Sequence, residues 1–175
     1  MNKDRYIALI AWAKKKPVRE QVLCGVTKWI PIFIGGFYIF TILFCMIMYP
    51  VALPRLILRP LLCFTTVTVL RNIVKAPRPY DVYGYIPLCG YRPGKNRSFP
   101  SRHTASAVIL ALEINIIFGG LLGVFCIILS FVMATFRVLC GNHFIKDVVA
   151  GLVLAVLFNC LWIEHNFNKF IDIAQ

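Results

Sequence analysis

Long uncharged runs of apolar residues limit the folds open to this chain more than any other feature. The run Trp29–Tyr49 contains no charged side chain, and a helix needs about 20 apolar residues to cross the hydrocarbon core of a bilayer. Further apolar runs follow at Val51–Leu70, Thr104–Phe118, Leu121–Phe136 and Val148–Ile163. The sequence therefore predicts an all-α fold, a polytopic transmembrane bundle of about five spanning helices.

Three charged residues interrupt these runs. Arg55 and Arg59 stand near the start of the second run, where long side chains can snorkel to the interface, so we expect the core of that helix at about Leu56–Val74. Glu113 lies shortly before a glycine pair that predicts a tight turn. We therefore expect Glu113 to lie at the membrane interface and not to be a buried proton carrier.

The chain has 175 residues, a length that predicts one domain over residues 1–175. Residues 1–28 contain apolar side chains followed by basic ones and predict an amphipathic helix lying on the membrane. The only long polar loop covers residues 75–100, and its tyrosines are expected to form an interfacial aromatic belt: Tyr80, Tyr83, Tyr85 and Tyr91. We also expect His165, beyond the last run, to lie at the interface.

The composition separates this chain from soluble basic proteins. Of its residues 59% are hydrophobic and 15% charged, with 19 basic against 7 acidic side chains. Nucleic-acid binding is disfavoured, because the apolar runs leave no soluble face for a basic stripe. Anionic lipid headgroups and a phosphate-bearing substrate explain the basic excess more simply.

The seven cysteines show neither C-x-x-C nor Cys/His ligand spacing, so no metal site is predicted from them. Cys24, Cys89 and Cys140 could lie near one surface. An odd total without a spacing rule predicts no disulfide.

Three clusters of chemically active residues are brought to one membrane face by the order of the spans. They are Arg71-x6-Arg78-Pro79, Pro100-Ser101-Arg102-His103 and Arg137-x5-His143-x3-Asp147. The second span ends at the first cluster, the third span starts at the second, and the fourth span ends near the third. Topology alone therefore predicts one site at this face.

The residue types in these clusters point to phosphoryl transfer. Converging guanidinium groups repel one another without an anion between them, and their forks match phosphate oxygens. His143 and Asp147 share a helix face, so the carboxylate can fix the imidazole tautomer and leave the other ring nitrogen free to attack. His103 can protonate the leaving oxygen and later activate water. This chemistry proceeds through a phosphohistidine and needs no metal or other cofactor.

These clusters resemble the three motifs of the type 2 phosphatidic acid phosphatase family, which shares its site with vanadium haloperoxidases. The family pattern is K-x6-R-P, then P-S-G-H, then S-R-x5-H-x3-D, and the resemblance covers roughly residues 60–160. It implies a helical membrane phosphatase with His143 as nucleophile, Asp147 as its orienting carboxylate and His103 as acid–base. It also implies that Arg71, Arg78, Ser101, Arg102 and Arg137 surround the phosphate.

Three positions depart from that pattern. Arg71 stands where the family usually has Lys, Arg102 replaces Gly, and Phe136 replaces Ser. None of these changes removes a catalytic group, so they concern only the fine geometry.

The membrane setting favours a phosphate carried by a lipid. The chain is similar to small bacterial undecaprenyl pyrophosphate or phosphatidylglycerophosphate phosphatases, and phosphatidic acid is a further candidate. The basic N-terminal segment predicts a cytoplasmic site by the positive-inside rule, whereas the resemblance implies an extracytoplasmic one, which we favour. Alternatives are a non-catalytic protein that binds anionic lipid and, with less support, a transporter. The oligomeric state is not predicted.

Overall fold

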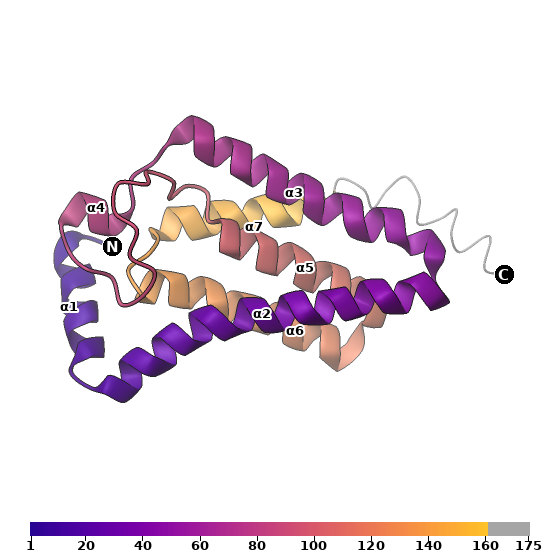
Figure 1. The fold of residues 1–175 in the computed structure, drawn as a ribbon, viewed down its shortest axis with the longest axis horizontal. Coiled ribbons are helices and arrows are strands. Elements are labelled where there is room, and N and C mark those ends of the chain that lie inside the picture. Colours follow the sequence, from indigo (N-terminus) through magenta and orange to yellow (C-terminus); the bar gives the residue numbers. More distant parts are fainter. Residues whose placement is uncertain (161–175) are drawn as a thin grey trace.

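The structure is a computed structural model that describes residues 1–160, and these residues contain helices and connecting segments but no strand. Figure 1 shows a bundle of elongated helices with shorter helices across one end. In chain order the elements are α1 (Lys3–Lys14), α2 (Pro17–Met48), the short 3₁₀ turn η1 (Pro50–Ala52), α3 (Leu53–Val74), α4 (Pro79–Tyr83), α5 (Arg102–Phe118), α6 (Gly120–Leu139) and α7 (Ile145–Cys160). The predicted all-α fold is confirmed.

Helix α5 lies at the centre of the bundle and contacts α2, α3, α6 and α7. Small side chains on its two faces allow this close packing. Ala107 and Ala111 meet α2 and α6, while Ala105 meets α3 and α7. The outer helices instead expose large apolar side chains, such as Ile47 and Leu121. An apolar exterior of this kind is suited to lipid, so the chain is a multi-pass membrane protein.

Three stretches of the described chain are long and apolar enough to cross a membrane: Pro17–Met48, Pro50–Tyr83 and Gly120–Leu139. Helices α5 and α7 complete the five-helix bundle and are shorter over the described residues. The expected fifth span ends at residue 163, so its last residues lie outside the described part, as does His165.

The predicted interfacial segment 1–28 is wrong in its extent. Residues 3–14 form α1, which crosses the end of the bundle, whereas residues 17–28 are the first turns of α2. The division falls at Pro17, because proline is well accommodated in the first turn of a helix and cannot continue the preceding one. Tyr6, Ile10 and Ala13 of α1 are buried against protein.

The interfacial placement of Glu113 is also wrong. Its side chain is fully buried, with Oε1 3.1 Å from Nη1 of Arg59 and Oε2 3.5 Å from Nε of Arg55. Asn159 of α7 also donates to Oε1, at 3.4 Å. Arg59 is likewise buried and does not snorkel, because pairing inside the bundle compensates its charge more directly than a route to the interface.

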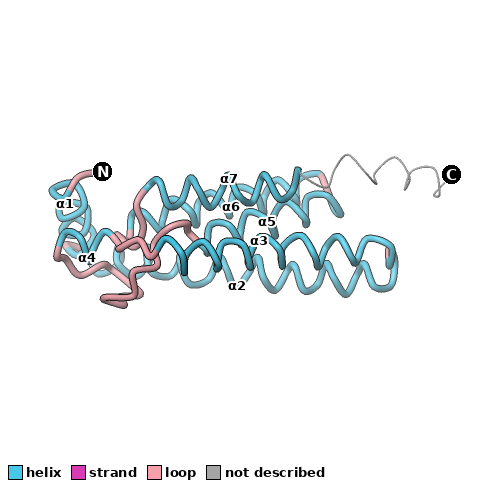
Figure 2. The backbone as a smooth tube through the Cα atoms, turned by 90° about the horizontal axis from the view of Figure 1, so that it is seen from above, coloured by secondary structure: helices cyan, strands magenta, loops and turns pink. Residues whose placement is uncertain are grey.

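All the elements that carry the predicted site meet at one end of the bundle. Figure 2 shows α1, α4 and the long loop gathered there, with the N-terminus beside them. The tyrosines of this loop do not form a uniform belt. Tyr80 is buried and Tyr85 is partly buried, and the hydroxyl group of each bonds a backbone carbonyl. Tyr91 is exposed.

Candidate active site

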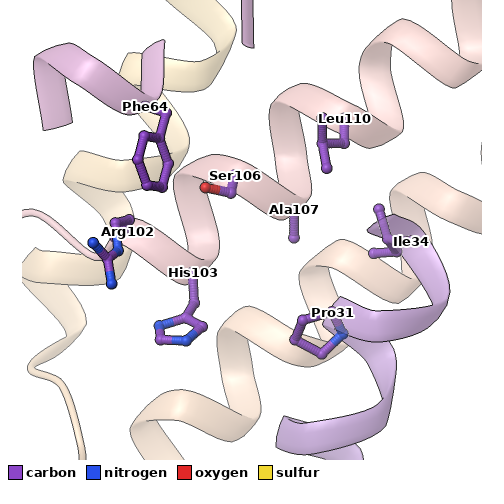
Figure 3. A pocket seen from close by; sticks show the side chains of 8 residues that line it. All are labelled: Pro31, Ile34, Phe64, Arg102, His103, Ser106, Ala107 and Leu110. Carbon is purple, nitrogen blue, oxygen red and sulfur yellow. The ribbon is translucent and has the colours of Figure 1, made fainter. Parts of the chain in front are cut away.

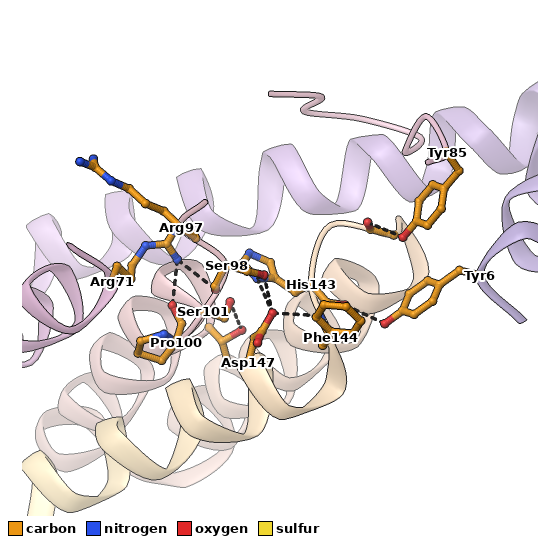
Figure 4. A network of polar contacts seen from close by, with 12 residues as sticks. Tyr6, Arg71, Tyr85, Arg97, Ser98, Pro100, Ser101, His143, Phe144 and Asp147 are labelled. Atoms are coloured by element: carbon orange, nitrogen blue, oxygen red, sulfur yellow. Dashed lines mark hydrogen bonds and ion pairs between the residues drawn. The ribbon is translucent and has the colours of Figure 1, made fainter. Parts of the chain in front are cut away.

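Backbone hydrogen bonds join the three predicted clusters into one site. The N–H of Ser98 donates to the carbonyl of Ala76 at 2.9 Å, and the N–H of Ser101 donates to the carbonyl of Asp147 at 2.8 Å. Figure 4 shows Arg71, Ser101, His143 and Asp147 gathered around this junction. The convergence expected from topology is thus present in the structure.

His143 lies in the short connection between α6 and α7, and Asp147 lies in the first turn of α7. Both side chains are buried, and Nδ1 of His143 is 3.5 Å from Oδ2 of Asp147. This separation is longer than an ordinary hydrogen bond, as is common in catalytic pairs without substrate. The carboxylate still faces Nδ1, which leaves Nε2 as the ring nitrogen available for attack.

Ser98 bridges this pair and was missed from the sequence. Its hydroxyl donates a short hydrogen bond to Oδ2 of Asp147 and lies 3.4 Å from Nδ1 of His143. The backbone N–H of Phe144 also donates to Oδ2 of Asp147, at 3.0 Å. Two donors therefore orient the carboxylate. Ser98 stands two residues before the motif that begins at Pro100, and no spacing rule singles it out.

Arg71 has a role in the structure beyond the one expected. Its guanidinium donates to the carbonyl of Pro100 at 2.8 Å, to that of Ser98 at 3.4 Å, and to that of Arg97. These bonds fix the loop that carries Ser98 and Ser101. Contact between Arg71 and phosphate stays a prediction.

Arg78 and Arg137 have more unpaired N–H donors than Arg71 and can offer them to an anion. The Nε atom of each is buried and has no hydrogen-bond partner among the described residues. Arg137 makes a long bond of 3.4 Å from Nη2 to the carbonyl of Thr27, and the Arg78 guanidinium lies 5.8 Å from the ring of Tyr80. Guanidinium groups with buried unpaired N–H donors fit a phosphoryl group.

Ser101 and Arg102 are placed differently from one another. The Ser101 hydroxyl is fully buried and bonds that of Thr104 at 2.9 Å, on the α5 side of Asp147. Arg102 is exposed and its guanidinium lies over the ring of Phe64, 5.3 Å from the centroid. The side chain that replaces the family glycine thus turns toward α3.

His103 faces a cavity of about 260 Å³ lined by residues of α2, α3 and α5. Figure 3 shows the imidazole of His103 and the guanidinium of Arg102 at one end of this cavity, with Ile34 and Leu110 at the other. His103 is also within electrostatic reach of His143 and Arg137. His103 therefore lies where the polar candidate site meets the apolar part of this cavity.

Helix α1 holds the connection that carries His143. The hydroxyl of Tyr6 donates to the carbonyl of His143 at 3.1 Å, and that of Tyr85 donates to the carbonyl of Gly141 at 2.9 Å. The two tyrosine rings stack with centroids 5.8 Å apart. Burial raises the pKa of Tyr6 to about 12, so its hydroxyl stays a donor. Neither tyrosine was expected near the site.

The electrostatic environment keeps the His143 imidazole neutral. Burial lowers its pKa from 6.5 to about 4, against the opposing effect of the Asp147 hydrogen bond, and the positive charges of Arg78 and Arg137 act in the same direction as burial. A neutral imidazole is the form that can attack phosphorus. Within residues 1–160, no group of three or more His, Cys, Asp or Glu side chains is placed to hold a metal ion.

Residues 52–170 of the chain match the family model of the PAP2 superfamily. The chain belongs to the PAP2 superfamily. This membership confirms the resemblance drawn from the three clusters, and it supports the predicted phosphatase class.

A solved structure with the PAP2 fold confirms the architecture. The transmembrane PAP2 type phosphatidylglycerolphosphate phosphatase from Bacillus subtilis aligns with a TM-score of 0.62 and 21% sequence identity, over 91% of this chain and 81% of that one. At this identity the likeness shows a shared fold. No curated protein matches the chain.

The segment matched to the PAP2 superfamily includes every predicted site residue but not α1. Tyr6 therefore reaches the site from outside the matched segment, and motif spacing within the PAP2 segment could not reveal it.

Proposed function

We propose that this PAP2 protein is a metal-independent lipid phosphate phosphatase that works through a phosphohistidine on His143. The observation that carries the proposal is the buried His143–Asp147 pair beside two arginines with unpaired buried donors. An anion-binding site alone would need the arginines but not an oriented, neutral imidazole.

The arrangement supports a reaction in two displacements. Nε2 of His143 attacks phosphorus, the bond from phosphorus to the lipid-side oxygen breaks, and protonated His103 gives that oxygen a proton. Neutral His103 then takes a proton from water as the water oxygen attacks phosphorus. The bond from phosphorus to nitrogen breaks, releasing inorganic phosphate and restoring both histidines.

Charge on the phosphoryl oxygens is the main demand of such a transfer. Arg78 and Arg137 are the side chains best placed to meet it, because their buried Nε donors have no other partner among the described residues. The backbone N–H of Ser101 is engaged by Asp147, and the guanidinium of Arg71 is engaged by the loop. We therefore assign Ser101 and Arg71 first to holding the site in shape.

The apolar part of the substrate has a place beside His103. The cavity at His103 shares Phe64, Ser106 and Leu110 with a second cavity of about 360 Å³ between α2, α3 and α5. The second cavity is lined almost wholly by apolar side chains, including Ile42 and Leu61. A lipid chain can lie along this path while its phosphate meets His143.

The substrate candidates differ in the anchor that would occupy this path. Undecaprenyl pyrophosphate carries a long isoprenyl chain, whereas phosphatidylglycerophosphate and phosphatidic acid carry two acyl chains. The Bacillus subtilis protein of the same fold is described as a phosphatidylglycerolphosphate phosphatase, which places that lipid in the test panel.

Release of inorganic phosphate from this panel is the deciding experiment. Purified protein in detergent, with a chelator present, is expected to hydrolyse at least one of the three lipids, and vanadate is expected to inhibit. The His143→Ala variant is expected to lose turnover, while Lys95→Ala, a change in the exposed part of the loop, keeps it. Full activity of His143→Ala would refute the mechanism.

The rival function, anionic-lipid binding without catalysis, predicts binding of the same lipids and no phosphate release from any of them. A transporter would instead move solute or ions across proteoliposomes.

The active site is proposed to face the extracytoplasmic side. Labelling of a cysteine introduced at Gly94, in the loop at this end of the bundle, by a membrane-impermeant reagent on intact cells tests this orientation, in a Cys160→Ala background that removes the exposed cysteine at the other end of α7. Labelling only after the cells are opened would reverse it.

A further inference from the structure

Three cysteines from distant parts of the chain meet beside the active site. Cys24 belongs to α2, Cys89 to the long loop, and Cys140 directly follows α6. They share one cluster with Ile10, Leu23 and Leu88 beneath α1. The mechanism proposed above uses none of them.

Hydrogen bonds fix these three segments against one another. The thiol of Cys24 donates to the carbonyl of Leu88 at 3.4 Å, and the N–H of Leu88 donates to the carbonyl of Cys140 at 3.2 Å. The thiol of Cys140 donates to the carbonyl of Leu23 at 3.7 Å. The thiols of Cys24 and Cys140 therefore lie against the residues that precede Cys89 and Cys24, which holds the three cysteines in one neighbourhood.

The sulfur of Cys89 has polar neighbours. The side-chain amide of Asn142 donates to it at 3.7 Å, and the hydroxyl oxygen of Thr27, whose proton goes to the carbonyl of Cys24, lies 3.4 Å from it. The thiol of Cys140 lowers the pKa of Cys89 most, and the positive charge of Arg137 acts in the same direction. A thiolate in such surroundings is nucleophilic at neutral pH.

Exposure distinguishes the three sulfur sites. Cys89 and Cys24 are half-buried, so a small reagent can reach this side of the cluster, whereas Cys140 is fully buried beneath them. Cys24 is therefore the neighbour that shares the open side of Cys89, while the buried thiol of Cys140 donates to the carbonyl of Leu23.

We propose that Cys89 is a redox modification site that reacts with small disulfides and is resolved by Cys24. The Cys89 thiolate attacks one sulfur of the reagent, whose S–S bond breaks and releases one thiolate. Cys24, on losing its proton, then attacks the Cys89 sulfur of the mixed disulfide and displaces the second thiolate. Two protein thiols are oxidised to one disulfide, and the reagent disulfide is reduced to two thiols.

The cluster is linked to the phosphate-binding side of the site through Thr27. Its hydroxyl contacts Cys89, and its carbonyl accepts from Arg137. The proposed disulfide ties the loop to α2 at this point, so it would restrain the residues that hold Arg137.

The test uses the full-length protein in detergent, reduced and then exposed to oxidised glutathione, with peptide mapping by mass spectrometry. A Cys160→Ala background removes the exposed cysteine at the end of α7. The expected product is a peptide pair joined through Cys24 and Cys89. In Cys24→Ser, glutathione is expected to stay attached to Cys89.

The same mapping can overturn the proposal without any activity assay. A Cys89–Cys140 linkage would replace Cys24 as the resolving residue, and an unreacted Cys89 in the folded wild type would remove the site altogether. The Cys140→Ala variant is expected to form the same linkage more slowly, because Cys89 loses the neighbouring thiol that lowers its pKa most. The wild-type map decides the outcome even where a variant does not fold.

Discussion

The hydroxyl of Tyr6 donates to the backbone carbonyl of His143 across 137 residues of sequence. This bond joins α1, which crosses the end of the bundle, to the connection that positions the proposed nucleophile. Because Tyr85 fixes the carbonyl of Gly141 in the same connection, two tyrosines limit the movement of the backbone that carries His143.

Removing the Tyr6 hydroxyl is expected to slow catalysis without abolishing it. A hydrogen bond of this kind contributes about 1 kcal/mol, so Tyr6→Phe should lower kcat by about fivefold with little change in KM. Initial rates over a range of lipid substrate concentrations measure both constants. Tyr83→Phe is the matched control, since that hydroxyl has no hydrogen-bond partner among the described residues. Equal effects of the two variants would contradict a positioning role for Tyr6.

The pH dependence of kcat/KM should show an acid limb far below that of an ordinary histidine. His143 must be neutral to attack, and burial lowers its pKa to about 4, so protonation removes the nucleophile only as pH falls toward that value. A profile measured from pH 4 to 8 with a lipid phosphate in detergent checks this, after allowance for the ionisation of the substrate. A fall in activity with its midpoint near pH 6.5, caused by protonation of His143, would show that the imidazole is not desolvated.

Gly151 is expected to tolerate no side chain. A Cβ atom there would lie 2.6 Å from the carbonyl oxygen of Ser101, where α7 passes α5 one turn after Asp147. Gly151→Ala should therefore destabilise the protein by about 1–3 kcal/mol and disturb the Ser101–Asp147 backbone bond. Thermal unfolding in detergent, with activity measured alongside, tests this. Gly25→Ala, where a Cβ meets nothing within 4 Å, serves as the control and should be no less stable than the wild type.

Breaking the buried ion pair of α3 and α5 is expected to cost more than removing both charges. Glu113→Leu leaves Arg59 buried without its partner, a change that typically costs about 3–5 kcal/mol. The double variant Glu113→Leu with Arg59→Leu should recover part of that loss. A double-mutant cycle on unfolding midpoints measures the coupling, and additive losses would show that the two residues do not interact.

The sequence was informative wherever spacing along one helix or the order of spans decided the outcome. The spacing of four residues indicated that His143 and Asp147 pair, although the expected shared helix face is wrong because His143 lies in the connection before α7. The order of the apolar runs brings His103 to the same end. Ser98, Tyr6 and Tyr85 could not be predicted, because their contacts depend on how loops and α1 fold back over the bundle. Glu113 was misplaced for a related reason, since its burial depends on which face of α5 meets Arg59.

The buried pair also has a consequence for how the chain enters the membrane during synthesis. Arg59 precedes Glu113 by 54 residues, so α3 emerges from the ribosome well before its counter-charge exists. An arginine in a lone helix opposes insertion by about 2.5–3.5 kcal/mol at the helix centre and by less toward an end, and Arg59 lies in the second turn of α3. Helix α3 should therefore insert more stably once α5 arrives, and a chain truncated before α5 should leave α3 less well integrated in the bilayer.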